Sequence, residues 1–305
     1  MMIRRIDLYL QGISVFGISM KKIAAIHDLS CFGRASLTVA IPILSDMGFQ
    51  VCPLPTAVLS AHSEYEGYRS VDLSDFIPEI AGHWQEMGLQ FDAIYSGYMA
   101  SEHQIDLVSG FFDVFGREDN FITVDPVLGD HGKLYPGLNT RMIAGMKNLC
   151  GKADIITPNL TEAALILGRE PKSRISLEEA ADWCERLSAE GPGRVIITSV
   201  PDDIEGKLAT VAYDRSADTA WSVSCEHIPA AYPGTGDAFA SVIVGSILGG
   251  DSLPEALKRA VYFIHMGIKT TFAYGTTPLD GICQEEILPY LRSALPEYEC
   301  KIIKR

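Results

Sequence analysis

The sequence predicts an α/β fold: a doubly wound, mainly parallel sheet with helices on both faces and a β-hairpin at the sheet edge. Short apolar runs alternate along the chain with longer segments that have helical periodicity. The apolar runs are nearly continuous rather than alternating, which is typical of parallel strands that are covered on both faces. We find no internal repeat or linker in the 305 residues, so we expect a single domain over residues 20–305.

The predicted elements alternate regularly, and glycines end several of them; Gly48, for example, ends the first helix. The expected strands are Ile23–His27, Phe49–Pro53, Ala93–Ser96, Phe121–Val124, Asp154–Thr157 and Val195–Thr198. The helices expected between them are Ala35–Met47, Leu73–Met87, Gln104–Phe115, Leu138–Leu149, Thr161–Leu167 and Leu177–Ala189. Two adjacent β-type runs, Leu208–Tyr213 and Ala220–Cys225, predict the edge hairpin. The remaining helices are expected over Ala238–Leu248, over Pro254–Thr270 and near Cys283–Ser293.

The charge and the cysteine content exclude several classes of partner. With a net charge of −14, the chain is not expected to bind nucleic acid or an anionic membrane surface. Its apolar runs are too short to cross a bilayer. Seven scattered cysteines without Cys-x-x-Cys spacing indicate reduced thiols in a cytoplasmic protein. We interpret residues 1–19 as an N-terminal extension, with Met20 as the natural start.

The run Gly234-Thr235-Gly236-Asp237, which opens an apolar helix, is the most informative motif. The first N–H groups of a helix have no partner inside it and bind anions, and glycines let a ligand approach the backbone. A carboxylate at such a site would repel the anion unless it takes a proton from an attacking hydroxyl. The motif therefore indicates phosphoryl transfer to an alcohol. A first-turn aspartate is also a common helix cap.

Because strands of a parallel sheet end at the same edge, polar residues at those ends should lie together. Asp125 and Asp130 follow one strand across Pro126 and Gly129, and two such carboxylates attract Mg²⁺. The alternative is that Asp125 caps the following turn. Asn159 and Glu162 follow the next strand and fit a capping box, which explains both structurally, although the same geometry aims them at the site.

Two further segments supply polar groups to the same edge. Thr198 and Ser199 end a strand with hydroxyls suited to phosphate oxygens. The segment Thr56–Tyr68 is rich in aromatic and hydrogen-bonding side chains and predicts a pocket for a flat polar ring. A lone histidine such as His62 is more often structural than a ligand contact.

Taken together, these motifs resemble those of the ribokinase-like superfamily in order and spacing. They are Asp-Pro-Val-Leu-Gly-Asp at 125–130, Thr-Pro-Asn-x-x-Glu at 157–162 and Gly-Thr-Gly-Asp at 234–237. The segments 26–36 and 53–62 are similar to the vitamin B6 kinases, in particular to the pyridoxamine kinase branch of Gram-positive bacteria. The resemblance covers about residues 21–290.

The resemblance implies a role for each matched position in an ATP-dependent kinase that phosphorylates the hydroxymethyl group of a B6 vitamer. Asp237 would be the base, and the N–H groups of Gly234, Thr235 and Gly236 the anion hole. Mg²⁺ would be bound near Asp130 and Glu162, and a monovalent cation such as K⁺ near Asp125 and Thr157. The nucleotide would contact Asn159, Thr198 and Ser199, with Tyr135 close by. The pyridine ring would be lined by Asp28, His62, Ser63 and Tyr98. The family also implies a homodimer.

Two positions depart from the pyridoxal kinases, many of which carry serine where this chain has Asp28 and threonine where it has Ser63. An acidic group at position 28 could favour a cationic aminomethyl substituent, or could bind a pyrimidine amino group. Hydroxymethylpyrimidine kinase, which shares the catalytic half, is therefore the alternative activity. A non-catalytic protein that binds a vitamer or nucleotide on the same fold is the alternative of another class, although such proteins usually lose the base or the metal carboxylates.

Overall fold

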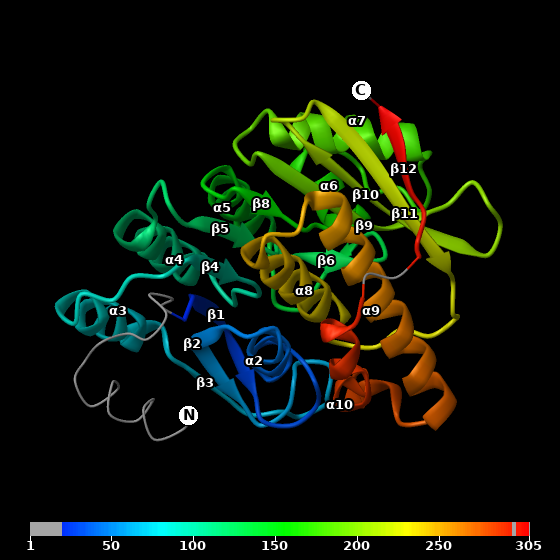
Figure 1. Cartoon of the computed structure of the whole chain (residues 1–305). Coiled ribbons are helices and arrows are strands. Elements are labelled where there is room, and N and C mark those ends of the chain that lie inside the picture. Colours follow the sequence, from blue (N-terminus) through cyan, green and yellow to red (C-terminus); the bar gives the residue numbers. More distant parts are fainter. Residues whose placement is uncertain (1–19, 295–296, 305) are drawn as a thin grey trace, which may run out of the picture.

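A ten-stranded sheet organises the computed structural model, which describes residues 20–294 and 297–304 (Figure 1). Its strands are β1 (Lys22–Ser30), β2 (Gln50–Leu59), β3 (Ser70–Asp72), β4 (Ala93–Ser96), β5 (Phe121–Val124), β8 (Ile155–Ile156), β9 (Arg194–Pro201), β10 (Lys207–Asp214), β11 (Thr219–Glu226) and β12 (Cys300–Lys304). A separate small hairpin pairs β6 (Gly129–Asp130) with β7 (Lys133–Leu134). The predicted extension, residues 1–19, lies outside the described residues.

The strand order is β12-β11-β10-β9-β8-β5-β4-β1-β2-β3. The neighbouring strands β9, β8, β5, β4, β1 and β2, in this sheet order, run parallel to one another. Strands β3, β10, β11 and β12 are antiparallel to their neighbours. From β1 the chain goes first to β2 on one side and later to β4 on the other. Such a reversal opens a crevice at the carboxyl ends of the strands, where ligands of doubly wound sheets bind.

Helices cover both faces of the sheet, as predicted (Figure 1). One face carries α2 (Leu37–Asp46), α8 (Thr235–Gly249) and α9 (Leu253–Tyr274), with Ile43, Phe239 and Phe263 in its core. The other face carries α3 (Ile77–Glu86), α4 (Glu102–Phe115), α5 (Thr140–Gly151), α6 (Leu160–Ile166) and α7 (Leu177–Ser188). Burial of both apolar layers accounts for strands that read as continuous apolar runs.

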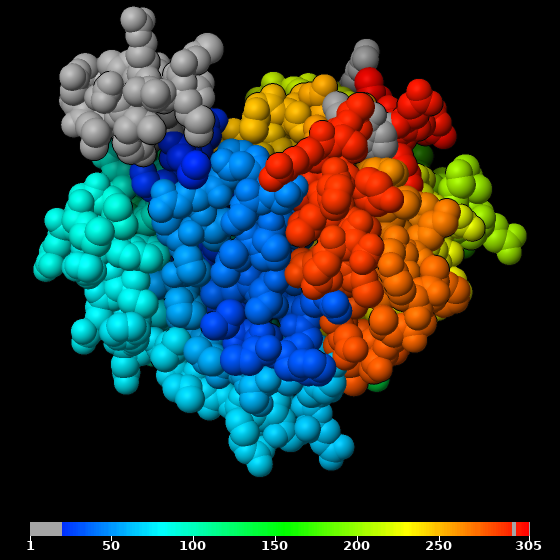
Figure 2. Space-filling model, turned by 60° about the horizontal axis from the view of Figure 1, so that its bottom comes forward, coloured from blue at the N-terminus to red at the C-terminus, as the bar shows by residue number. Residues whose placement is uncertain are grey.

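Residues 34–46 pack against residues 280–292. Figure 2 shows this late segment, in red, directly beside the early segment, in blue. Arg34 bonds Glu285, and Arg292 bonds Asp46. The C-terminal region consists of α10 (Gln284–Ile287) followed by a 3-10 turn (Leu288–Arg292), not the one helix expected near Cys283–Ser293. Pro289 in this segment lacks the N–H that a continued α-helix needs.

Three other expectations need correction. The β10–β11 hairpin is not at the sheet edge, because β12 pairs with β11 and forms that edge. Strand β2 continues to Leu59, beyond Pro53 and Pro55, and pairs with β3 only at Ala57–Leu59. The prolines are tolerated because β3 does not reach them, so no strand on that side of β2 needs the N–H groups that they lack. The fifth predicted strand is shortened to Ile155–Ile156.

Among the described residues, no helix has both the length and the apolar character that crossing a membrane would require.

Candidate active site

The N-terminus of α8 is built by Gly234, which adopts a left-handed φ of +76°. A Cβ at this position would collide with the carbonyl oxygen of Arg34, so only glycine fits. The N–H groups of Gly234, Thr235 and Gly236 make no backbone hydrogen bond within the described residues. These donors, together with the positive end of the helix dipole, form an anion site.

Asp237 lies in the first turn of α8, directly after these donors in the chain. Its Oδ2 accepts a 2.8 Å hydrogen bond from the backbone N–H of Ser36. Its carbonyl oxygen accepts bonds from the hydroxyls of Tyr95 and Ser241. Burial, followed by the negative charge of Asp125, raises the pKa of Asp237 to about 8. A carboxyl that titrates near neutral pH suits general-base catalysis.

His27, within β1, lies next to Asp237. Its Nδ1 is 3.7 Å from Asp237 Oδ1, and its ring packs edge-on against Tyr95. The side chain is fully buried, and burial lowers the pKa of His27 to about 3. The imidazole is therefore neutral at physiological pH, and its contact with Asp237 is not an ion pair.

Asp28, next on β1, is buried and bonded to two hydroxyls. Its Oδ1 accepts a hydrogen bond from Ser36 Oγ at 2.5 Å, and its Oδ2 accepts one from Ser30 Oγ at 3.0 Å. Burial raises the pKa of Asp28, although these hydrogen bonds oppose the shift. Both carboxyl oxygens are thus engaged by the chain itself.

Asp125 and Glu162 form a second acidic group beside the anion site. An ideal Cβ on Gly236 would lie 3.7 Å from Asp125 Oδ2, which places this carboxylate next to the α8 N-terminus. Asp125 Oδ1 accepts a 2.9 Å bond from the hydroxyl of Thr157. Burial raises the pKa of Asp125 to about 7, and burial and the Asp125 charge raise the pKa of Glu162 well above its usual range.

The capping box predicted at the start of α6 is present. Asn159 Oδ1 accepts from the N–H of Glu162, and Glu162 Oε2 accepts from the N–H of Asn159. The remaining groups are also engaged: Glu162 Oε1 accepts from the N–H of Leu128, and Asn159 Nδ2 donates to the carbonyl of Gly129. These bonds tie α6 to the loop that carries the two predicted metal carboxylates.

Four other predicted residues lie around this loop and β9. Asp130 is partly exposed on the β6–β7 hairpin, and Tyr135 follows it, its pKa raised by burial and by the Glu162, Asp130 and Asp125 charges. Thr198 forms an isolated parallel β-bridge with Asn159, just beyond the paired residues of β8 and β9. Ser199 is exposed and has a φ of +60°, at an irregularity of the β9–β10 ladder. Such irregularities commonly re-aim side chains near active sites.

The remaining predicted acceptor residues, His62, Ser63 and Tyr98, follow β2 and β4 in the chain. His62 is buried, and its Nε2 lies 2.6 Å from the carbonyl oxygen of Leu279. Ser63 is exposed beside it. Tyr98 is half-buried, and its pKa is raised by burial and by the proximity of Tyr68 and Asp28. Of these residues, Ser63 and Tyr98 are the ones whose hydroxyls make no protein hydrogen bond within the described residues.

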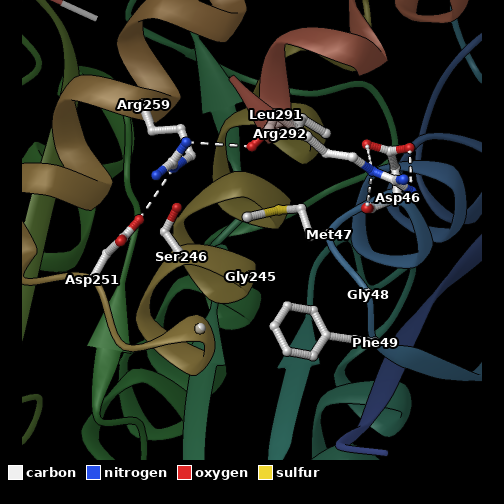
Figure 3. Close-up of a pocket in the computed structure, with 11 residues that line it drawn as sticks. Asp46, Met47, Gly48, Phe49, Gly245, Ser246, Asp251, Arg259, Leu291 and Arg292 are labelled. Carbon is white, nitrogen blue, oxygen red and sulfur yellow. Dashed lines mark hydrogen bonds and ion pairs between the residues drawn. The ribbon is translucent and has the colours of Figure 1, made fainter. Parts of the chain in front are cut away.

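A cavity of about 470 Å³ lies away from this crevice, at the C-terminal end of α8 (Figure 3). Its lining includes Ser246, Phe49 and two arginines that are already paired, Arg259 with Asp251 and Arg292 with Asp46. None of the predicted site residues lines it.

The structure also brings in groups that the sequence motifs did not single out as site residues. They are Ser36, Tyr95 and His27, all in contact with Asp237. His27 ends the strand predicted over Ile23–His27 and could have been found by that signal, although β1 continues to Ser30 in the structure. Nothing in the sequence indicates that the N–H of Ser36 turns toward a helix almost 200 positions later.

A doubly wound sheet with an anion site and a largely buried carboxylate at its carboxyl edge is the arrangement of a ribokinase-like kinase, and solved kinase structures share this fold. The chain belongs to the phosphomethylpyrimidine kinase family, whose family model matches residues 26–280.

Several relatives share the fold over most of their length. A protein provisionally assigned as a phosphomethylpyrimidine kinase from Bacteroides thetaiotaomicron, crystallised with pyridoxal, is 49% identical (TM-score 0.90; 93% of this chain and 100% of that one). The pyridoxal kinase of Lactobacillus plantarum is 32% identical (TM-score 0.82; 90% and 97%). Pyridoxal kinase PdxY of Rubrobacter xylanophilus is 27% identical over 277 residues, which cover 87% of this chain and 93% of that protein.

Proposed function

We propose that this kinase transfers the γ-phosphoryl group of ATP to the hydroxymethyl group of a vitamin B6 vitamer. The observation that carries the proposal is the carboxyl of Asp237, only 12% exposed, beside the N–H groups of the α8 N-terminus that have no backbone partner within the described residues. The similarity to pyridoxal kinases, and to a protein crystallised with pyridoxal, supports the choice of acceptor.

In the proposed reaction, Asp237 accepts the proton of the acceptor hydroxyl. The acceptor oxygen then forms a bond to the γ-phosphorus, while the bond from that phosphorus to the bridging oxygen breaks and its electron pair leaves with ADP. The N–H groups of Gly234, Thr235 and Gly236 donate to the transferring phosphoryl group. Because these donors belong to a helix end and are already oriented, they need no reorganisation during the reaction.

The donor set fits bound cations. Asp125 and Glu162 are both buried, and no cationic side chain contributes to the pKa of either. Within the described residues no three His, Cys, Asp or Glu side chains cluster as a complete metal site. This matches Mg²⁺, which keeps waters and phosphate oxygens as most of its ligands.

We assign Asp130 and Glu162 to Mg²⁺, and Asp125 and Thr157 to a monovalent cation such as K⁺. Mg²⁺, when bound, neutralises charge on the nucleotide phosphates. Asn159, Thr198 and Ser199, with Tyr135 nearby, would meet those phosphates. In the acceptor pocket, Ser63 and Tyr98 would offer hydroxyls to the ring, and His62 would form part of the wall.

The acceptor is tested by measuring kcat/KM with pyridoxal, pyridoxamine, pyridoxine and hydroxymethylpyrimidine, following ADP release and identifying the product by phosphorus NMR. We expect the B6 vitamers to be preferred. A clear preference for the pyrimidine, which the family description favours, would replace the substrate and keep the mechanism. Binding without turnover of any acceptor would indicate a non-catalytic protein.

The base is tested in the same assay with Asp237→Asn. We expect a folded protein whose kcat falls by about 10²–10⁴. Asp203→Asn, at an exposed loop position, is the matched control and should retain wild-type turnover. Turnover near wild type in Asp237→Asn would refute the assignment.

We further propose that the protein is a cytoplasmic homodimer. All seven cysteines are unpaired in the structure, which suits a reducing compartment. Light scattering coupled to size-exclusion chromatography tests the dimer, and a monomeric mass at assay concentrations would contradict it.

A further inference from the structure

Ser36 has an unusual backbone for a serine. It is the residue before α2, and its φ of +56° with ψ of −128° lies in a region that residues with a side chain rarely adopt. Its N–H donates to Asp237 Oδ2 at 2.8 Å. Without this backbone conformation, the N–H would not point at the carboxylate.

The side chain of Ser36 is held from the other direction. Its hydroxyl donates to Asp28 Oδ1 at 2.5 Å, and both residues are buried, with exposures of 6% for Ser36 and 4% for Asp28. The second oxygen of Asp28 is occupied by Ser30 Oγ at 3.0 Å. One serine therefore links two carboxylates, through its hydroxyl to Asp28 and through its N–H to Asp237.

We propose that Asp28 is a positioning residue for the base. By binding the Ser36 hydroxyl it holds Ser36 in the positive-φ conformation, and the Ser36 N–H in turn fixes Asp237 Oδ2. The other oxygen, Oδ1, is then left to receive the proton of the acceptor hydroxyl. This inference rests on the proposed function, and it differs from a role of Asp28 in choosing among vitamers.

The two roles make different predictions for the kinetics. A residue that aligns the base acts on kcat and affects all acceptors alike, whereas a residue that contacts the ring changes KM and changes the ratio between pyridoxamine and pyridoxal. We therefore expect Asp28→Asn and Ser36→Ala each to lower kcat at least about tenfold for both vitamers, with KM changed less than about threefold.

Glycine at position 36 separates positioning from general damage to the fold. Ser36→Gly loses the hydroxyl but adopts a positive φ without an anchor, so we expect it to keep kcat closer to the wild type than Ser36→Ala does. Asp28→Asn should then lower kcat less in the Ser36→Gly background than in the wild type, because the hydroxyl that Asp28 binds is already gone. Ser30→Ala is the matched control: it removes the other hydroxyl from Asp28 and should cost less than Ser36→Ala.

Melting temperatures show whether each variant is folded under assay conditions, and Asp237→Asn is measured in parallel. The inference is overturned if Asp28→Asn alters the pyridoxamine to pyridoxal ratio at unchanged kcat, or if it costs the same in both backgrounds. If Asp237→Asn remains active, the proposed base fails instead, and the inference fails with it. If Asp237→Asn is inactive while Asp28→Asn and Ser36→Ala turn over like the wild type, only the positioning role fails.

Discussion

His27 Nδ1 lies 3.7 Å from Asp237 Oδ1, and neither ring nitrogen of this fully buried histidine has a hydrogen-bond partner within the described residues. A neutral imidazole without partners beneath a carboxyl is costly to protonate, because burial disfavours its charged form. This relationship has consequences for stability that can be measured independently of activity.

We expect His27 to destabilise the fold in acid. Its pKa is about 3 in the folded state and about 6.5 in the unfolded chain. Between these values the unfolded state binds more protons, so stability falls as the pH falls, by up to about 1.4 kcal/mol per pH unit. In urea unfolding, the free energy of unfolding should fall less between pH 7 and pH 5 for His27→Leu than for the wild type. His103→Leu, at an exposed position, should not flatten the profile, and equal slopes for wild type and His27→Leu would contradict the prediction.

The carboxyls have the opposite effect, over a window that reaches higher pH. Asp237 has a pKa of about 8 and Asp125 a pKa of about 7, both raised above the unfolded value of 3.8. The folded state binds more protons from about pH 4 to about pH 8, so these carboxyls make the stability of the ligand-free protein fall as the pH rises through that window. Between about pH 6.5 and about pH 8, His27 is neutral in both states and no longer opposes them. Thermal unfolding across this range should show a smaller fall for Asp237→Asn. A melting temperature of the wild type that rises with pH in this range would contradict the prediction.

Gly234→Ala should be severely destabilising for two separable reasons. The left-handed φ of +76° is strained for a residue with a Cβ, and the Cβ would also collide with the carbonyl oxygen of Arg34. Gly275 has a φ of +63° but open space around it, so Gly275→Ala measures the strain alone, about 1–2 kcal/mol. We expect denaturant unfolding to give a clearly larger loss for Gly234→Ala. Equal losses would show that the Arg34 contact adjusts freely.

Glu162→Gln tests the acidic group beside the anion site. The amide oxygen can still accept from the N–H of Asn159, but the amide NH2 then faces the N–H of Leu128, which bonds the second carboxyl oxygen in the wild type. We expect the ligand-free protein to lose about 1–3 kcal/mol of stability for this unsatisfied donor, and a higher Mg²⁺ concentration for half-maximal activity. Glu255 occupies the same position in the capping box of α9 at an exposed site, so Glu255→Gln should leave the Mg²⁺ dependence unchanged. An unchanged Mg²⁺ requirement in Glu162→Gln would contradict the metal role.

Most of the sheet could be predicted from the sequence, because each buried strand is a continuous apolar run that is short enough to be recognised locally. Strands β4 and β5 have the predicted bounds. Strand β12 was missed because Cys300–Lys304 mixes lysine and apolar residues on both faces, without an apolar run or alternation, and becomes a strand by pairing with β11. The extension of β2 was missed because prolines normally end strands. A strand can contain prolines where no neighbouring strand pairs on that side, and the sequence does not show where β3 stops pairing with β2.

The sequence by itself determined the fold class, the glycines of the α8 N-terminus and the carboxylates at the strand ends, since these follow from local periodicity and from the chemistry of single residues. Tertiary structure alone decided what surrounds Asp237. Its pKa depends on burial and on Asp125, and its orientation depends on a hydrogen bond from Ser36, which is 201 residues away in the chain. Such couplings arise from distances in space, and those exist only once the strands have been brought to one edge of the sheet.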